Sequence, residues 1–240
     1  MEAGQPQPIA PDTDPTPSHQ KVWATQKVWD WPTRLVHWSL VILIALSWWS
    51  VENKRMDIHY WSGLCVVGLI VFRIYWGFAG PETARFARFI KGPRAIFSYA
   101  GKLFRPDYRA SFGHNPLGAL SVIALLLVVA IQAGMGLFAS DTSYVSSGPL
   151  NGLVSYETSK EITDLHEDFF NVVLAVIGLH LAAIVFYLVG KRTNLIGPMI
   201  TGRRKAVNVE GPPAGIAPVS WIRLAIGIGL AVGVVWFIAR

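Results

Sequence analysis

Residues 166–189 read HEDFFNVVLAVIGLHLAAIVFYLV, and this stretch decides the fold of the 240-residue chain. It is long and apolar enough to cross a membrane as one helix, because about 20 apolar residues span a hydrocarbon core of about 30 Å. Its two histidines, His166 and His180, are separated by nearly four helical turns. They therefore share one face of the helix and lie about 21 Å apart along its axis.

Four more segments of similar length and character accompany it. The five predicted spans are residues 32–51, 59–78, 116–138, 167–189 and 218–239. The chain is 52% hydrophobic and only 15% charged, whereas a soluble domain carries about 25% charged residues. We therefore predict an all-α integral membrane protein, with a four-helix transmembrane bundle and a fifth, C-terminal transmembrane helix.

The charges between the spans predict the orientation. Loops 79–115 and 190–217 are rich in Arg and Lys, whereas 139–166 has one Lys among four acidic residues. The positive-inside rule places the two basic loops in the cytoplasm, so the N terminus is cytoplasmic and the C terminus periplasmic. The net charge of +6 comes from residues that flank spans and gives no reason to expect nucleic acid binding.

Composition divides the rest of the chain. Residues 1–27 are polar and Pro-rich and are predicted to be a disordered cytoplasmic tail. Residues 28–205 form the four-helix domain, 206–217 a linker, and 218–240 the last span. Segment 85–105 alternates Phe and Ile with Arg and Lys, which fits either a helix on the membrane surface or a solvated loop. Cys65 is the only cysteine, so an intrachain disulfide and a Cys-rich metal site are excluded.

Histidines occur in or near the spans at two depths. His59 and His166 lie at the outer side, whereas His37 and His180 lie toward the cytoplasmic side. An imidazole on each axial face is a natural ligand set for haem iron between facing helices. The positions therefore predict an outer haem held by His59 and His166, and an inner haem held by His37 and His180. Alternatively, the outer histidines are ordinary boundary residues and His180 is a proton relay or a buried hydrogen-bond donor, although ionisable residues inside a span are usually functional.

Other residues fit supporting roles in this scheme. Arg34 and Arg73 are candidates to pair with the propionates of the inner haem, although positive-inside flanking explains Arg34 equally well. Gly63, Gly134 and Gly178 would leave room for a flat macrocycle or serve ordinary helix packing. His114 either caps the third span or lines a quinone or propionate site. The fifth span carries Gly227, Gly229 and Gly233, which permit close packing against another helix.

Several stretches resemble the bacterial di-haem cytochrome b family, which includes the membrane subunit of nickel–iron hydrogenases and the bacterial cytochromes b-561. They are VWDWPTRLVHW, IHYWSGLCVVGLIVFRIYWGFAG, GHNPLGAL, LHEDFFNVVLAVIGLH and NLIGPMITGRRK. The resemblance covers about residues 28–205. It implies two non-covalent b-type haems with His37, His59, His166 and His180 as ligands, and quinone as a further small molecule.

The resemblance also implies a function in the bacterial inner membrane. Such a protein carries electrons between the quinone pool and a redox partner, which is a hydrogenase, a dehydrogenase or a cytochrome c. One alternative is a stand-alone superoxide oxidase that reduces quinone. An alternative of another class is a haem-free membrane anchor or transporter. No Ser, Cys or carboxylate constellation for hydrolysis is present in the sequence.

Overall fold

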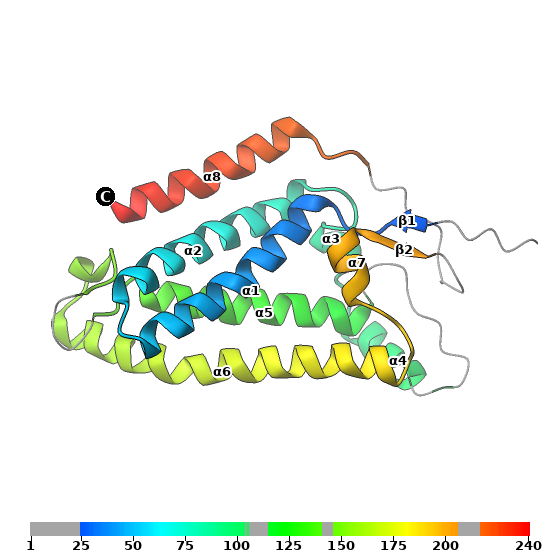
Figure 1. Cartoon of the computed structure of the whole chain (residues 1–240), viewed down its shortest axis with the longest axis horizontal. Helices are drawn as coiled ribbons and strands as arrows, with labels where there is room; N and C mark the ends of the chain where they lie inside the picture. The colour runs from blue at the N-terminus through cyan, green and yellow to red at the C-terminus, as the bar shows by residue number, and fades with distance from the viewer. Residues whose placement is uncertain (1–24, 104, 106–114, 141–145, 206–216) are drawn as a thin grey trace, which may run out of the picture.

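The computed structural model describes residues 25–103, 105, 115–140, 146–205 and 217–240. Within these residues, five helices are long and apolar enough to cross a membrane: α1 (Trp31–Glu52), α2 (Met56–Ala79), α5 (Pro116–Gly136), α6 (Tyr156–Val189) and α8 (Trp221–Ala239). They run side by side along the long axis of the molecule (Figure 1). The predicted helical membrane protein with five spans is confirmed.

Side-chain caps fix where several of these helices begin. Asp30 accepts a hydrogen bond from the Thr33 amide at 2.9 Å and caps α1. Asn115 caps α5 and accepts from the Gly118 amide at 2.7 Å. Ser155 caps α6, which therefore begins eleven residues before the apolar segment at 167. That extension is polar, so a search for apolar segments does not detect it as helix; the cap at Ser155 marks where it begins.

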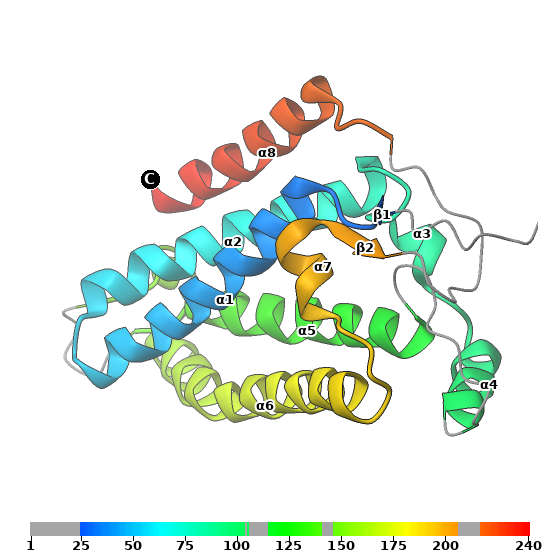
Figure 2. The ribbon, with the colours of Figure 1, turned by 45° about the vertical axis from the view of Figure 1, so that its right-hand side comes forward.

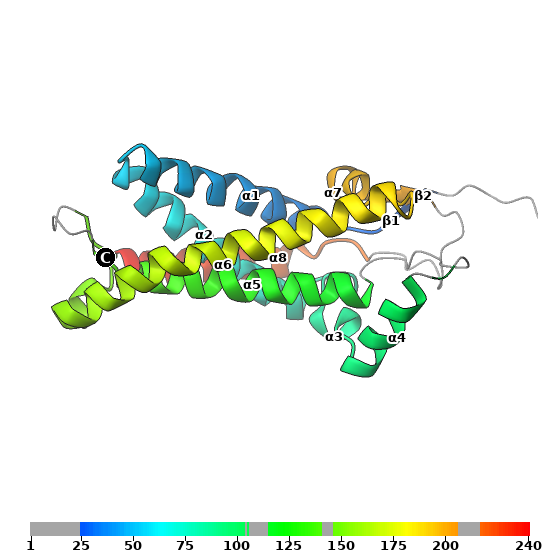
Figure 3. The same ribbon diagram turned by 90° about the horizontal axis from the view of Figure 1, so that it is seen from below.

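Two helix pairs form the bundle. α1 packs along α2, and α5 packs along α6, while α2 meets α5 and joins the pairs. α1 and α6 approach each other less closely and meet through side chains, with the ring centroids of Trp48 and Phe170 6.0 Å apart. The view from below separates α1 from the α5–α6 pair (Figure 3).

An apolar layer fills the middle of the bundle. Its buried members are Val66 and Ile70 from α2, Val129 from α5 and Val173 from α6. Side chains from α1 pack on this layer, together with Phe169, Phe170 and Ile177 from α6. These α6 residues lie between His166 and His180 in the sequence, so the layer separates the two histidine levels.

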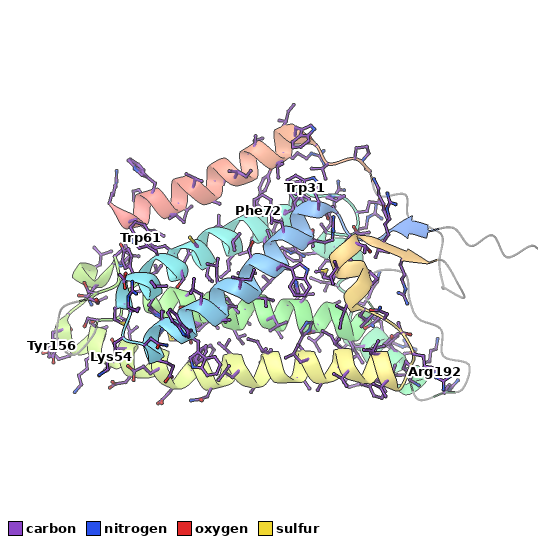
Figure 4. The ribbon with its side chains drawn as sticks, viewed as in Figure 1. Trp31, Lys54, Trp61, Phe72, Tyr156 and Arg192 are labelled. Atoms are coloured by element: carbon purple, nitrogen blue, oxygen red, sulfur yellow. The ribbon has the colours of Figure 1, made fainter. Side chains whose placement is uncertain are left out.

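α8 lies on the outside of α2 (Figure 1). A Cβ added at Gly227 would lie 2.8 Å from the Tyr75 ring and 3.0 Å from Phe72, a side chain that lies between α2 and α8 (Figure 4). The close packing predicted for Gly227 is therefore confirmed. A Cβ added at Gly229 or Gly233 would meet no atom of the described residues within 4 Å, so the same prediction is wrong for them.

Short elements gather at one end of the bundle (Figure 2). They are α3 (Phe86–Phe89), α4 (Pro93–Leu103), α7 (Ile196–Thr201) and an antiparallel pair of strands, β1 (Thr25–Lys27) and β2 (Arg203–Lys205). The sequence did not predict the strands, and β1 falls in the predicted tail. Gly202, at a φ of 75°, makes the turn into β2, and its carbonyl accepts a hydrogen bond from Val28 at 2.8 Å.

The two ends differ in charge. We call the end with α3, α4, α7 and the strands the basic end, because it carries the Arg- and Lys-rich segments. The acidic end holds the α1–α2 turn, the η1 turn (Asn151–Leu153) and the start of α6, with Glu157, Glu161, Asp164, Glu167 and Asp168. Lys54 and Tyr156 lie at the acidic end and Arg192 at the basic end (Figure 4).

Candidate functional site

A cavity opens between four helices at the acidic end. Its volume is about 490 Å³, and residues of α1, α2, α5 and α6 line it. His59 and His166 are both in the lining. The volume is within the 300–1,000 Å³ typical of small-molecule and cofactor sites.

The structure brings His59 and His166 together from α2 and α6. Their ring centroids are 6.2 Å apart, and the ring planes are almost perpendicular, at 88°. These two residues were predicted to lie at the same depth, and the fold places them at one level of the bundle. We call them the acidic-end pair.

Main-chain carbonyls orient both rings of the acidic-end pair. The Nδ1 atom of His59 lies 3.1 Å from the Ser47 carbonyl oxygen and 3.0 Å from the Ser47 hydroxyl. The Nδ1 atom of His166 lies 3.0 Å from the Gln132 carbonyl oxygen. Because a carbonyl can only accept, these contacts assign the proton to Nδ1 in each ring. Nε2 then carries the lone pair in each ring, as a metal-binding imidazole requires. In His166 this atom lies 3.3 Å from the Gln132 side-chain nitrogen.

His37 and His180 form the second pair, toward the basic end. They come from α1 and α6 and lie within electrostatic range of each other. The Nδ1 atom of His180 lies 3.0 Å from the Ser121 hydroxyl. The Nδ1 atom of His37 is buried and has no hydrogen-bond partner in the part of the chain that the structure describes. We call these two residues the basic-end pair.

The two candidate arginines lie near the basic end. Arg34 donates from Nη1 to the Ile200 carbonyl, and its buried Nε has no partner among the described residues. Arg73 is buried on α2, with its guanidinium carbon 5.0 Å from the Phe86 ring centroid and Nη1 3.5 Å from the Ala84 carbonyl. Their proposed pairing with propionates stays a prediction.

Sequence reasoning missed four polar residues that support the site. Asp30 accepts hydrogen bonds from Thr33 and, at 3.0 Å, from the Trp76 indole, and so ties α1 to α2. Ser47, Ser121 and Gln132 hold histidine rings. A signal was present for two of them, because Ser121 and Gln132 are the only hydroxyl and the only amide side chain within α5.

Glycines leave space beside the histidines. Among the residues that the structure describes, a Cβ added at Gly63, Gly134 or Gly178 would meet no atom within 4 Å. Gly63 lines the acidic-end cavity one turn after His59. At Gly136 an added Cβ would lie 3.0 Å from Cε1 of His166, so that glycine gives the imidazole its room.

These residues fit the haem that the sequence led us to expect. Facing imidazoles with unprotonated Nε2 atoms supply the donor set, the buried Nδ1 of His37 needs a partner, and the glycines leave open space for a flat group. His59 and His166 would hold one haem, and His37 and His180 another. His19 and His114 lie outside the described residues.

Comparison with known proteins gives one match. The family model described as prokaryotic cytochrome b561 matches residues 28–202. All four paired histidines lie within the match, and α8 lies beyond it. The searches of curated proteins and of solved structures each gave no significant match.

Proposed function

We propose, from the premise that this chain belongs to the prokaryotic cytochrome b561 family, that it carries electrons between two haems at different depths of one membrane. Membership itself makes it a haem-b electron-transfer protein of the membrane. Our proposal adds the number of haems, their ligands, the orientation of the chain and the molecules with which it exchanges electrons.

A single observation carries the proposal. His166 and His180 lie on α6, about 21 Å apart along its axis, and each has a histidine from another helix at its own level. One such pair would fit a protein with one haem. Two pairs at two levels of one bundle fit a route through the membrane.

The chain's own residues would then do three things. When bound, each haem supplies an iron that gains and loses one electron. The acidic-end and basic-end pairs would hold the two haems through Nε2. Ser47, Ser121 and Gln132 would keep the rings oriented, and the apolar layer around Val66 and Val173 would exclude water between the two levels.

The charge pattern supports an orientation. With the basic end in the cytoplasm, the N terminus is cytoplasmic and the acidic end faces the periplasm of a bacterial inner membrane. A redox protein, which is a hydrogenase, a dehydrogenase or a cytochrome c, would meet the acidic end. Quinone dissolved in the membrane would be the other partner in the exchange.

Haem stoichiometry tests the proposal. We expect the purified chain to contain two b-type haems, and His166→Ala and His180→Ala each to retain one. The measurement is haem per protein by the absorbance of its pyridine complex. A wild-type chain with one haem, or either variant with two, would refute the assignment of the pairs. A chain without b-type absorption would refute the cytochrome function itself.

A further inference from the structure

We infer that α4 lies in the membrane surface at the basic end and binds anionic phospholipid, with Phe97 among the acyl chains and Arg94 and Lys102 at the phosphates. The sequence alone is compatible with either a membrane-surface helix or a solvated loop for segment 85–105. Lipid binding of this kind is separate from electron transfer, and it requires neither haem nor a particular orientation of the chain.

Hydrogen bonds place α4 at the level where two spans end. The Tyr99 hydroxyl lies 3.1 Å from the hydroxyl of Tyr187, which is two residues before α6 ends at Val189. Asn115, the cap of α5, donates to the same Tyr187 oxygen at 3.1 Å. Because one long apolar helix ends here and another begins, α4 lies near the boundary between hydrocarbon and water.

The direction of α4 differs from that of the spans. It runs across the five long helices rather than along them (Figure 2), and it projects past α5 at the side of the bundle (Figure 3). At the level of the membrane boundary, a helix with this direction lies close to the membrane plane. It then has lipid on one side and water on the other.

Three faces of α4 differ in character. The face toward the bundle is partly or fully buried and consists of Ile96, Tyr99, Ala100 and Leu103. Arg94, Ser98 and Lys102 follow one another at intervals of four residues, so they form one exposed polar row. Phe97 belongs to the row between these two faces and is 76% exposed. A helix on a membrane surface inserts such a ring into the acyl region and keeps its charged row at the headgroups.

The charges around α4 indicate the class of lipid. Loop 79–115 has seven basic residues and only two acidic ones, Glu82 and Asp107. Arg88 pairs with Glu82 at 2.8 Å. Four further basic side chains are exposed and have no ion pair within the described part of the chain: Lys91, Arg94, Lys102 and Arg105. Positive side chains at a membrane surface attract anionic headgroups, so α4 should prefer an anionic phospholipid to a zwitterionic one.

Quenching of a fluorescent label tests the position of α4. In a Cys65→Ser background, the label is attached at Gly101→Cys, on the row of Phe97, or at Ser98→Cys, on the polar row. The full chain is placed in nanodiscs of equal parts phosphatidylcholine and phosphatidylglycerol. Nitroxide on the acyl chains should quench the label at 101 more than that at 98, and aqueous iodide should do the reverse. Equal quenching at the two positions, or the opposite order, would show a solvated helix and overturn the inference.

The headgroup of the quencher tests the lipid class, with the label at 101. Nitroxide-labelled phosphatidylglycerol should quench at a lower mole fraction than nitroxide-labelled phosphatidylcholine, by about fivefold for each basic side chain at the headgroup. Arg94→Gln with Lys102→Gln should remove most of this preference. The matched control is Lys54→Gln with Lys160→Gln, which removes two exposed positive charges at the acidic end and should leave the preference unchanged. No preference in the chain with its native charges, or the same loss in both double variants, would refute the binding of anionic lipid by α4.

Discussion

The Nδ1 atom of His166 on α6 lies 3.0 Å from the main-chain oxygen of Gln132 on α5. A second hydrogen bond joins the same two residues: the Gln132 side-chain Nε2 donates to the His166 carbonyl at 2.9 Å. Two bonds in opposite directions fix the register of α5 against α6 at the level of the acidic-end cavity. A one-residue slip of either helix would therefore turn the imidazole away from His59.

Gly63→Leu should remove the acidic-end haem without harm to the protein. The new side chain would enter the cavity beside His59, where no atom of the described part of the chain lies within 4 Å of an added Cβ. Glycine is also about 1 kcal/mol less favourable than alanine inside a helix, so the haem-free protein should be at least as stable as the wild type. We expect the variant to hold one haem in place of two. With haem removed from both proteins, the variant should unfold at the same temperature as the wild type or at a higher one.

The control is the same exchange at Gly229 on α8, where an added Cβ would also meet no atom of the described residues within 4 Å. It should leave both haems in place. Two haems in Gly63→Leu would mean that the space beside His59 is not where the macrocycle lies.

Gly227→Leu should weaken the packing of α8 on α2. The glycine lies directly against Tyr75 and Phe72, and overpacking of this kind costs about 1–3 kcal/mol. The midpoint of thermal unfolding in detergent should fall, while haem content stays the same, because the histidine pairs lie on α1, α2 and α6. Equal midpoints for Gly227→Leu and Gly229→Leu would contradict the close approach of the two helices.

Asp30→Ala should be strongly destabilising. Its carboxylate caps α1 and accepts the Trp76 indole N–H, and both groups are buried. Loss of the cap costs about 1 kcal/mol and an unsatisfied buried donor about 1–3 kcal/mol, which together give about 2–4 kcal/mol. Denaturant unfolding would measure this. Asp57→Ala, which removes an exposed carboxylate, should have no measurable effect, and a similar loss in both variants would refute the role given to Asp30.

Single cysteines report the orientation in the membrane. In a Cys65→Ser background, Lys160→Cys at the acidic end should react in intact cells with a maleimide that cannot cross the membrane. Arg94→Cys on α4 should react only after the cells are opened. Both positions are exposed. The reverse pattern would show that the basic end faces the periplasm.

Hydropathy predicts helices well where lipid is the solvent. Four of the five spans begin within three residues of their predicted starts, but α6 extends into a polar segment that Ser155 caps. Strands β1 and β2 were not predicted, because their pairing joins segments almost 180 residues apart through main-chain bonds. The residue pattern within either three-residue strand does not indicate that the two segments pair.

The histidine pairing followed from helix geometry, since position along a spanning helix fixes depth. His59 and His166 do meet at one level. The contacts that hold the rings did not follow, because the carbonyls of Ser47 and Gln132 carry no side-chain signature. The neighbourhood of Arg73 was equally hidden, since Ala84 and Phe86 reach it from another part of the chain.

The length of α6 has a consequence for any protein that docks there. Its 34 residues extend about 51 Å, whereas the hydrocarbon core is about 30 Å thick. The first three turns of α6, which contain Glu157 and Glu161, therefore extend beyond the hydrocarbon core as a rigid, negatively charged segment of helix. A protein that approaches this end would contact that helix segment before it came near His166. Its surface therefore needs a recess or positively charged side chains around the contact to come within electron-tunnelling distance.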